Sequence, residues 1–104
     1  MSELRDLTRR EAVAKGLLKE LSPEYAARLK NGDLVVYTDV TQIFGDKLFE
    51  APYEYIVRRV EPLPDKINVL VELEAPDRRT RPVSHRLVLV SPQLYDELEK
   101  RNVS

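Results

Sequence analysis

Four arginines lie in and after one short connection in the second half of the chain: Arg78, Arg79, Arg81 and Arg86. The first three belong to the proline-bounded loop 76–82, which we predict to be a hairpin tip. A guanidinium group is planar, keeps its charge at physiological pH and binds phosphate or carboxylate oxygens through parallel hydrogen bonds. The cluster therefore predicts an anion-binding site for a nucleic acid, a nucleotide-like anion or an acidic protein surface.

The same arginines are also compatible with a solvated turn. Glu72, Glu74 and Asp77 lie within a few residues of them and can act as counter-charges. Nucleic-acid binding usually adds aromatic side chains on which bases stack. Tyr53 and Tyr55 belong to another predicted strand, so the sequence does not place them beside the arginines. Both interpretations stay open.

A second candidate site is the apolar segment 43–49, which holds both phenylalanines of the chain. Its Gly45-Asp46 dipeptide favours a type II′ turn, so we predict a hairpin here. A projecting hairpin would expose four large side chains as a docking or oligomerisation patch. These are Ile43, Phe44, Leu48 and Phe49. The alternative is a hairpin that folds back as a lid on the sheet.

Groups suited to catalysis are few. His85 is the only histidine, which excludes a histidine metal cluster and a paired-histidine acid/base mechanism. The hydroxyl of Ser84 would point to the opposite face of a strand, and Ser91 lies in no nucleophile-elbow motif. We therefore predict no enzymatic activity, and we expect His85 to be hydrogen-bonded or solvent-facing on a strand.

The sequence also predicts no cofactor and no metal site. Asp39, Asp46 and Glu50 lack the spacing of a calcium-binding loop. The chain has no cysteine, which excludes disulfides, thiolate nucleophiles and cysteine-ligated zinc or iron–sulfur clusters. The glycines are too far apart to cradle a phosphate; they are Gly16, Gly32 and Gly45. No small-molecule substrate is expected.

Length and composition narrow the class of protein. The 104 residues fit one domain, 1–104, with a single core. With a net charge of −1 and a pI of about 5.9, the chain as a whole is not attracted to nucleic acid or to an anionic membrane. Since no apolar stretch resembles a secretory signal or a membrane span, we expect a soluble, cytoplasmic protein. The high content of charged residues, 34%, indicates a thermophilic source.

Two helices are predicted in the segment 8–31. Thr8 begins a capping-box pattern, and apolar residues at helical spacing then continue the first helix. This stripe consists of Val13, Leu17 and Leu21. Ser22, followed by proline, caps a second and shorter helix that ends at Gly32.

Four strands are predicted in the segment 33–91, and a Ser-Pro pair at Ser91 then begins a C-terminal helix over 92–101. The strand candidates are 34–44, 53–60, 67–74 and 87–90. The last is apolar on both faces, as in a central strand covered on both sides. Because the links are too short for parallel crossovers, the strands should be antiparallel. We therefore predict an α+β fold: a twisted four-stranded antiparallel sheet, open or curled into an SH3-like barrel, with two N-terminal helices and one C-terminal helix.

Two short segments carry a resemblance to a known family. Gly32-Asp33-Leu34-Val35-Val36, and separately Arg81-Pro82 with the segment 87–92, resemble the opening strands of the MazF-type endoribonuclease toxins, which are SH3-like barrels. In that family a short loop joins the two segments, whereas here two predicted strands separate them. The chain is therefore not assigned to the family.

The function expected from the sequence is that of a non-enzymatic interaction module. It would bind a protein partner or copies of itself, through the apolar segment 43–49 or an exposed strand edge, as a regulatory adaptor or an assembly component of a cell or a virus. The alternative is a nucleic-acid-binding domain that uses the arginine cluster. A hydrolytic enzyme ranks well behind both.

Overall fold

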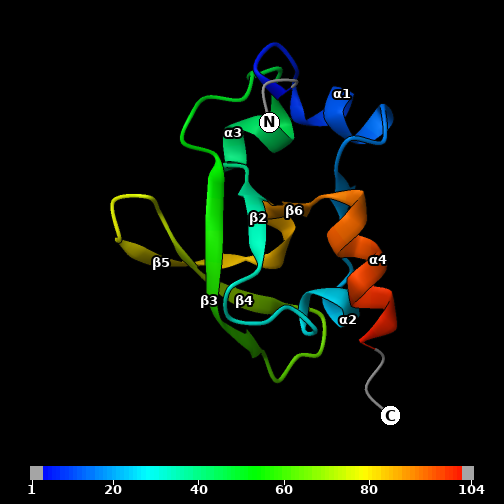
Figure 1. The fold of residues 1–104 in the computed structure, drawn as a ribbon, viewed down its shortest axis with the longest axis vertical. Coiled ribbons are helices and arrows are strands. Elements are labelled where there is room, and N and C mark those ends of the chain that lie inside the picture. The colour runs from blue at the N-terminus through cyan, green and yellow to red at the C-terminus, as the bar shows by residue number, and fades with distance from the viewer. Residues whose placement is uncertain (1–3, 102–104) are drawn as a thin grey trace.

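A six-stranded antiparallel sheet forms the centre of the computed structural model, which describes residues 4–101 (Figure 1). The strands are β1 (Lys19–Glu20), β2 (Leu34–Tyr37), β3 (Glu54–Pro62), β4 (Val69–Glu74), β5 (Thr80–Ser84) and β6 (Val88–Val90). Their order in the sheet is β1-β6-β2-β3-β4-β5, so β1 and β5 are its two edges and the sheet is open. The prediction of four strands is therefore wrong, and the sheet does not close into an SH3-like barrel.

Within residues 4–101, four α-helices accompany the sheet, rather than the three predicted. They are α1 (Arg9–Ala14), α2 (Pro23–Ala26), α3 (Val40–Phe44) and α4 (Pro92–Lys100). A short 3₁₀ helix, η2 (His85–Leu87), joins β5 to β6. The fold remains α+β. None of the helices in the described part of the chain is long and apolar enough to cross a membrane.

The first helix is shorter than its apolar stripe predicts. The capping box forms: the Thr8 hydroxyl accepts from the Glu11 amide, and the Glu11 carboxylate accepts from the Thr8 amide. The helix nevertheless ends at Ala14, because Gly16 adopts a left-handed conformation with φ +74° that turns the chain back. The next residues then extend as β1, which pairs with β6.

The predicted hairpin at Gly45-Asp46 is also wrong, since α3 takes its place. Asp39 caps this helix: its carboxylate accepts from the Gln42 amide at 3.1 Å, while Gln42 Oε1 accepts from the Asp39 amide at 2.9 Å. Gly45 has φ −138° and is extended, whereas a type II′ turn needs a positive φ at its first central residue. The strand predicted over 34–44 therefore divides into β2 and α3.

Apolar side chains pack on both faces of the sheet. On one face, α2 and α4 cover a large cluster that includes Val35, Val57 and Leu98. On the other face, α1 and the segment before β3 cover a smaller cluster that includes Val36 and Leu89. β2 and β6 are therefore covered on both sides, which agrees with the uninterrupted apolar run predicted for β6.

Two features at the margins of the sheet matter for function. The β4–β5 hairpin projects from the body of the molecule (Figure 1). The opposite side is closed by α4, which begins at the Ser91 N-cap with Pro92 in the first turn, as predicted. Its C-terminal end is fixed by Arg101, which donates two hydrogen bonds to the Asp33 carboxylate at 2.8 and 3.2 Å.

Candidate interaction surfaces

The predicted apolar patch is divided by the fold. Phe44 is 84% exposed on α3, and Val40, one turn earlier on the same helix, is 55% exposed. Leu48 follows with 45% exposure. These three residues form what we call the α3 face. Because residues four apart lie on one side of a helix, Val40 and Phe44 present a continuous apolar strip to solvent.

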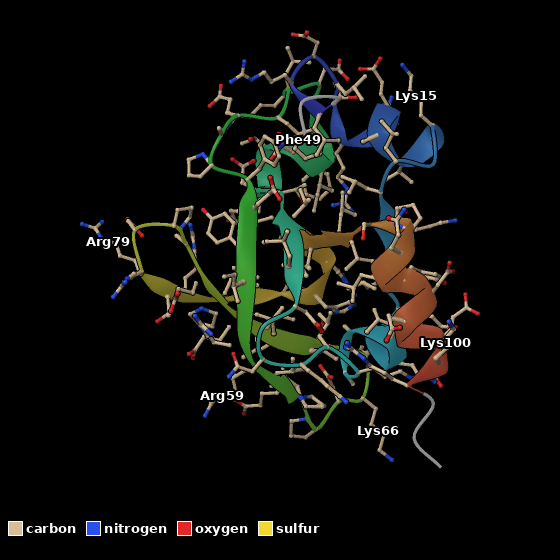
Figure 2. All side chains as sticks on the ribbon, viewed as in Figure 1. Lys15, Phe49, Arg59, Lys66, Arg79 and Lys100 are labelled. Carbon is tan, nitrogen blue, oxygen red and sulfur yellow. The ribbon has the colours of Figure 1, made fainter. Side chains whose placement is uncertain are left out.

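The other two residues of the predicted patch point inward. Phe49 is only 3% exposed; it belongs to the smaller core cluster and packs edge-on against Tyr53, with ring centroids 5.8 Å apart. In Figure 2, Phe49 lies within the upper part of the molecule rather than at its outline. Ile43 is half-buried. Of the two alternatives from the sequence, Phe49 fits a segment folded back on the sheet, and Phe44 fits a segment that projects into solvent.

A cleft of about 360 Å³ lies between α1 and α3; it is lined by Ile43 and Gly45, the two chain neighbours of Phe44, but not by Phe44 itself. Apolar groups form much of its wall, namely Val13, Ala14, Ile43 and the adjoining Gly45, and charged or polar side chains complete it, namely Arg9, Arg10, Glu20 and Gln42. The α3 face and this cleft together place an apolar projection next to an apolar hollow.

The base of the cleft is held by a polar network around Arg9, which is almost completely buried. One of its terminal nitrogens donates to the Thr38 hydroxyl at 2.9 Å and to the Arg86 carbonyl at 3.1 Å, and the other donates to Glu20 at 2.8 Å. The Thr38 hydroxyl in turn donates to the Leu87 carbonyl at 3.1 Å. Because these polar groups are satisfied, α1 is fixed to the sheet in one position.

The predicted arginine cluster is also divided. Arg78 and Arg79 lie at the tip of the β4–β5 hairpin, where Arg79 stands far from the body in Figure 2. Arg81 lies on β5, with its guanidinium carbon 5.0 Å from the centre of the Tyr37 ring, a cation–π contact. Tyr37 in turn packs edge-on against Tyr55 at 5.3 Å.

Arg86 lies apart from the other three arginines. It lies in η2, beyond the far end of β5, where its charge contributes to lowering the pKa of Asp65 after the hydrogen bonds from Asn68 and Ile67. The sequence could not reveal the contact between Arg81 and Tyr37, since it depends on how β2 and β5 meet across the sheet.

The expected counter-charges are only partly available to these arginines. Glu74 accepts two hydrogen bonds from Arg58, at 3.1 and 2.9 Å, which lower the pKa of its carboxyl and raise the pKa of Arg58. Asp77 lies 3.6 Å from Arg79 in an exposed pair. Since exposed pairs are weak, the hairpin tip keeps most of its positive charge.

His85 is buried, at 3% exposure, in η2 rather than on a strand as predicted. Its Nδ1 accepts a hydrogen bond from the Val69 amide at 3.3 Å, which requires this nitrogen to be unprotonated. Burial, followed by the charge of Arg86, lowers the pKa of the imidazole. The Ser84 hydroxyl accepts from the Arg86 amide and caps η2. Both side chains therefore have structural roles.

The carboxylates that the sequence offered as cation ligands do not gather into a site. Asp39 accepts from Thr41, from Lys47 at 3.0 Å and from the Gln42 amide; these hydrogen bonds, that from Thr41 first, lower the pKa of its carboxyl to about 2. Among residues 4–101, no group of three potential metal ligands is close enough to hold an ion.

A second concave surface lies between β2 and α4. This groove has a volume of about 310 Å³. Most of its lining is apolar: Leu18, Leu34, Val35, Val36 and Leu94. Glu54, Ser91, Gln93 and Glu97 supply its polar groups. The sequence did not predict this site, because its walls come from segments more than fifty residues apart.

Comparison of the chain with models of protein families, with curated proteins and with solved structures found no match. The function therefore has to be inferred from these surfaces.

Proposed function

We propose that this protein is a non-enzymatic interaction module that binds a second copy of itself through α3. The observation that carries the proposal is the position of Phe44, an 84% exposed aromatic side chain whose two chain neighbours, Ile43 and Gly45, line the cleft between α1 and α3. A large exposed aromatic residue beside an apolar hollow is typical of the centre of a protein interface.

The arrangement is self-complementary. In a two-fold symmetric interface, the same patch on each copy contacts its counterpart. A two-fold axis between Phe44 and the cleft would direct each Phe44 into the cleft of the other copy, against Ile43 and Val13. Val40, on the same side of α3, would be covered at the same time.

Charges beside Phe44 and beside the cleft favour a second copy of this protein over an unrelated partner. Arg10 lines the cleft and Asp46 lies two residues after Phe44. Neither makes an ion pair with another of residues 4–101, whereas Glu20 and Lys47 are already paired, with Arg9 and Asp39. A dimer that seats Phe44 in the cleft brings Asp46 of one copy towards Arg10 of the other.

The expected affinity is weak. Burying each Phe44 contributes about 2–3 kcal/mol, so the symmetric interface gains about 4–6 kcal/mol from the two. Loss of rotational and translational freedom offsets part of this gain, and the covering of Val40 adds to it. We therefore expect a dissociation constant on the order of 1 mM.

Light scattering after size-exclusion chromatography tests the proposal. At about 1 mM, near the expected dissociation constant, the wild type and Leu34→Ser should be mixtures of monomer and dimer and Phe44→Ser a monomer. Leu34 is the matched control, because it is an exposed apolar residue on a different surface. Arg10→Asp should weaken the dimer, and adding Asp46→Arg should restore it. Self-association through α3 would be refuted if the wild type were monomeric at about 1 mM, or if Phe44→Ser formed the dimer as well as the wild type does.

A second candidate function is nucleic-acid binding by the β4–β5 hairpin. It is favoured by the contact of Arg81 with Tyr37, which puts an aromatic ring beside the cationic hairpin, a combination used by proteins that bind single strands. The overall charge of −1 opposes it.

A further inference from the structure

The groove between β2 and α4 shares no lining residue with the cleft of the proposed dimer. In Figure 1, β2 runs through the centre of the molecule and α4 runs alongside it, at the right. Leu34, Val35 and Val36 of β2 line the groove together with Leu18, and Leu94 lines it from α4. Leu34 is 55% exposed, unusually high for a leucine on an inner strand of a sheet.

The floor of the groove disfavours a partner that adds a strand. β2 pairs with β3 from Leu34 to Val36, and β6 pairs with Val36 and Tyr37, so only Leu34 and Val35 lie beyond the end of β6. Since the backbone groups of successive residues point to opposite sides of a strand, at most one of these two residues offers its groups to a new strand. An occupant must satisfy its own backbone groups while it presents apolar side chains, and an α-helix is the element that does so.

The rim of the groove is acidic. Gln93 and Glu97 are one turn apart on α4 and line the same side. Among residues 4–101, no lysine or arginine lines the groove. Of the two glutamates that line it, Glu97 is exposed; its charge also acts on Arg101, which is hydrogen-bonded to Asp33. An apolar floor with an acidic rim favours an occupant that has apolar residues on one face and cations beside them.

We propose that this groove binds an amphipathic, basic helix of a partner protein. Leucine-like side chains at three- and four-residue spacing would enter the hollow between Leu34 and Leu94, and a flanking lysine or arginine would pair with Glu97. The chain would then have two surfaces, one for its own copy and one for a different protein.

The test uses a synthetic helical peptide of about four turns, with leucines along one face and lysines on both flanks, and fluorescence anisotropy. The full-length protein carries Phe44→Ser throughout, so that peptide binding is measured on a protein whose dimer surface is removed. Leu34→Ser and Glu97→Lys should each weaken binding by about tenfold, and the effect of Glu97→Lys should shrink at high salt.

Two substitutions serve as matched controls. Val40→Ser removes an apolar side chain with the same 55% exposure from another surface. Glu99→Lys reverses a charge on the side of α4 that faces Tyr25, whose pKa it helps to raise. Both proteins should bind the peptide as tightly as their parent.

Three results would overturn the proposal: no binding by the parent protein below about 1 mM, equal binding by all variants, or equal binding of a peptide with glutamates in place of the lysines. A proline-containing peptide of otherwise similar composition that binds equally well would exclude a helical occupant. Because dimer formation is removed from this experiment, its outcome is independent of self-association.

Discussion

Phe44 and Phe49 are the only two phenylalanines, five residues apart, and the fold gives them opposite environments. The same substitution, to serine, should therefore have opposite consequences at the two positions. Phe49→Ser should destabilise each molecule, and Phe44→Ser should act on association alone. Their comparison separates a core role from a docking role within one short segment.

The magnitudes follow from burial. Truncating a fully buried phenylalanine costs about 3–5 kcal/mol, and a serine hydroxyl buried without a partner adds about 1–3 kcal/mol. Since a domain of this size is stabilised by only about 5–15 kcal/mol in total, Phe49→Ser will be largely unfolded or close to it. Phe49→Leu, which keeps an apolar side chain, should cost about 1–2 kcal/mol and leave a folded protein. Phe44→Ser should change the stability of the separate molecule by less than about 0.5 kcal/mol.

Urea unfolding at two protein concentrations measures both effects. A dimer is stabilised by mass action, so the midpoint of the wild type should rise with concentration, whereas that of Phe44→Ser should not. At the lower protein concentration, the wild type and Phe44→Ser should have the same urea midpoint. If Phe44→Ser cost several kcal/mol in dilute solution, or if Phe49→Leu cost nothing, the assignment of Phe44 to the surface and Phe49 to the core would be refuted.

Two further predictions concern His85 and the arginine hairpin. Burial holds the pKa of His85 below its ordinary value of 6.5, so the unfolded chain binds the proton more tightly than the folded protein does. The free energy of unfolding should therefore have its full value above pH 6.5 and should decrease as the pH falls from there towards the lowered pKa. His85→Asn, which keeps an acceptor for the Val69 amide, should lose this part of the pH dependence of urea unfolding, and an unchanged profile would contradict it. Arg78 and Lys66 are exposed cations with φ of +69° and +63°, so glycine should replace either without loss of stability. If the hairpin binds single-stranded RNA, Arg78→Gly should reduce the slope of log affinity against log salt by about one and Lys66→Gly should not; equal slopes would reject the nucleic-acid function.

Local chemistry made the helix starts predictable. Thr8, Ser22 and Ser91 each cap a helix because the hydroxyl satisfies an amide of the first turn, an interaction within a few residues. The capping pattern of Asp39 and Gln42 was equally visible in the sequence. It does not by itself predict a helix, because it lies within an apolar, β-branched run that also favours a strand.

What the sequence could not reveal depends on contacts between distant segments. The end of α1 is set by Gly16, whose left-handed conformation overrides an apolar stripe that continues at helical spacing. Pairing of β1 with β6 then adds a strand of only two residues, too short to leave a pattern. The groove and the contact of Arg81 with Tyr37 both require the order of the strands, which no local pattern specifies.

The two sheet edges themselves are poor sites for a partner strand, which leaves side-chain surfaces to carry recognition. One edge, β1, is two residues long. The other, β5, contains Pro82 opposite Glu72 of β4. Proline has no amide hydrogen, so it fits this ladder only where its nitrogen faces the free edge, and it removes the central donor from that edge. Strand addition, one of the docking modes expected from the sequence, is thus disfavoured at both edges. Apart from Ile67 in the β3–β4 connection, the large exposed apolar residues lie on the α3 face and in the β2–α4 groove, where a partner is recognised by shape and charge.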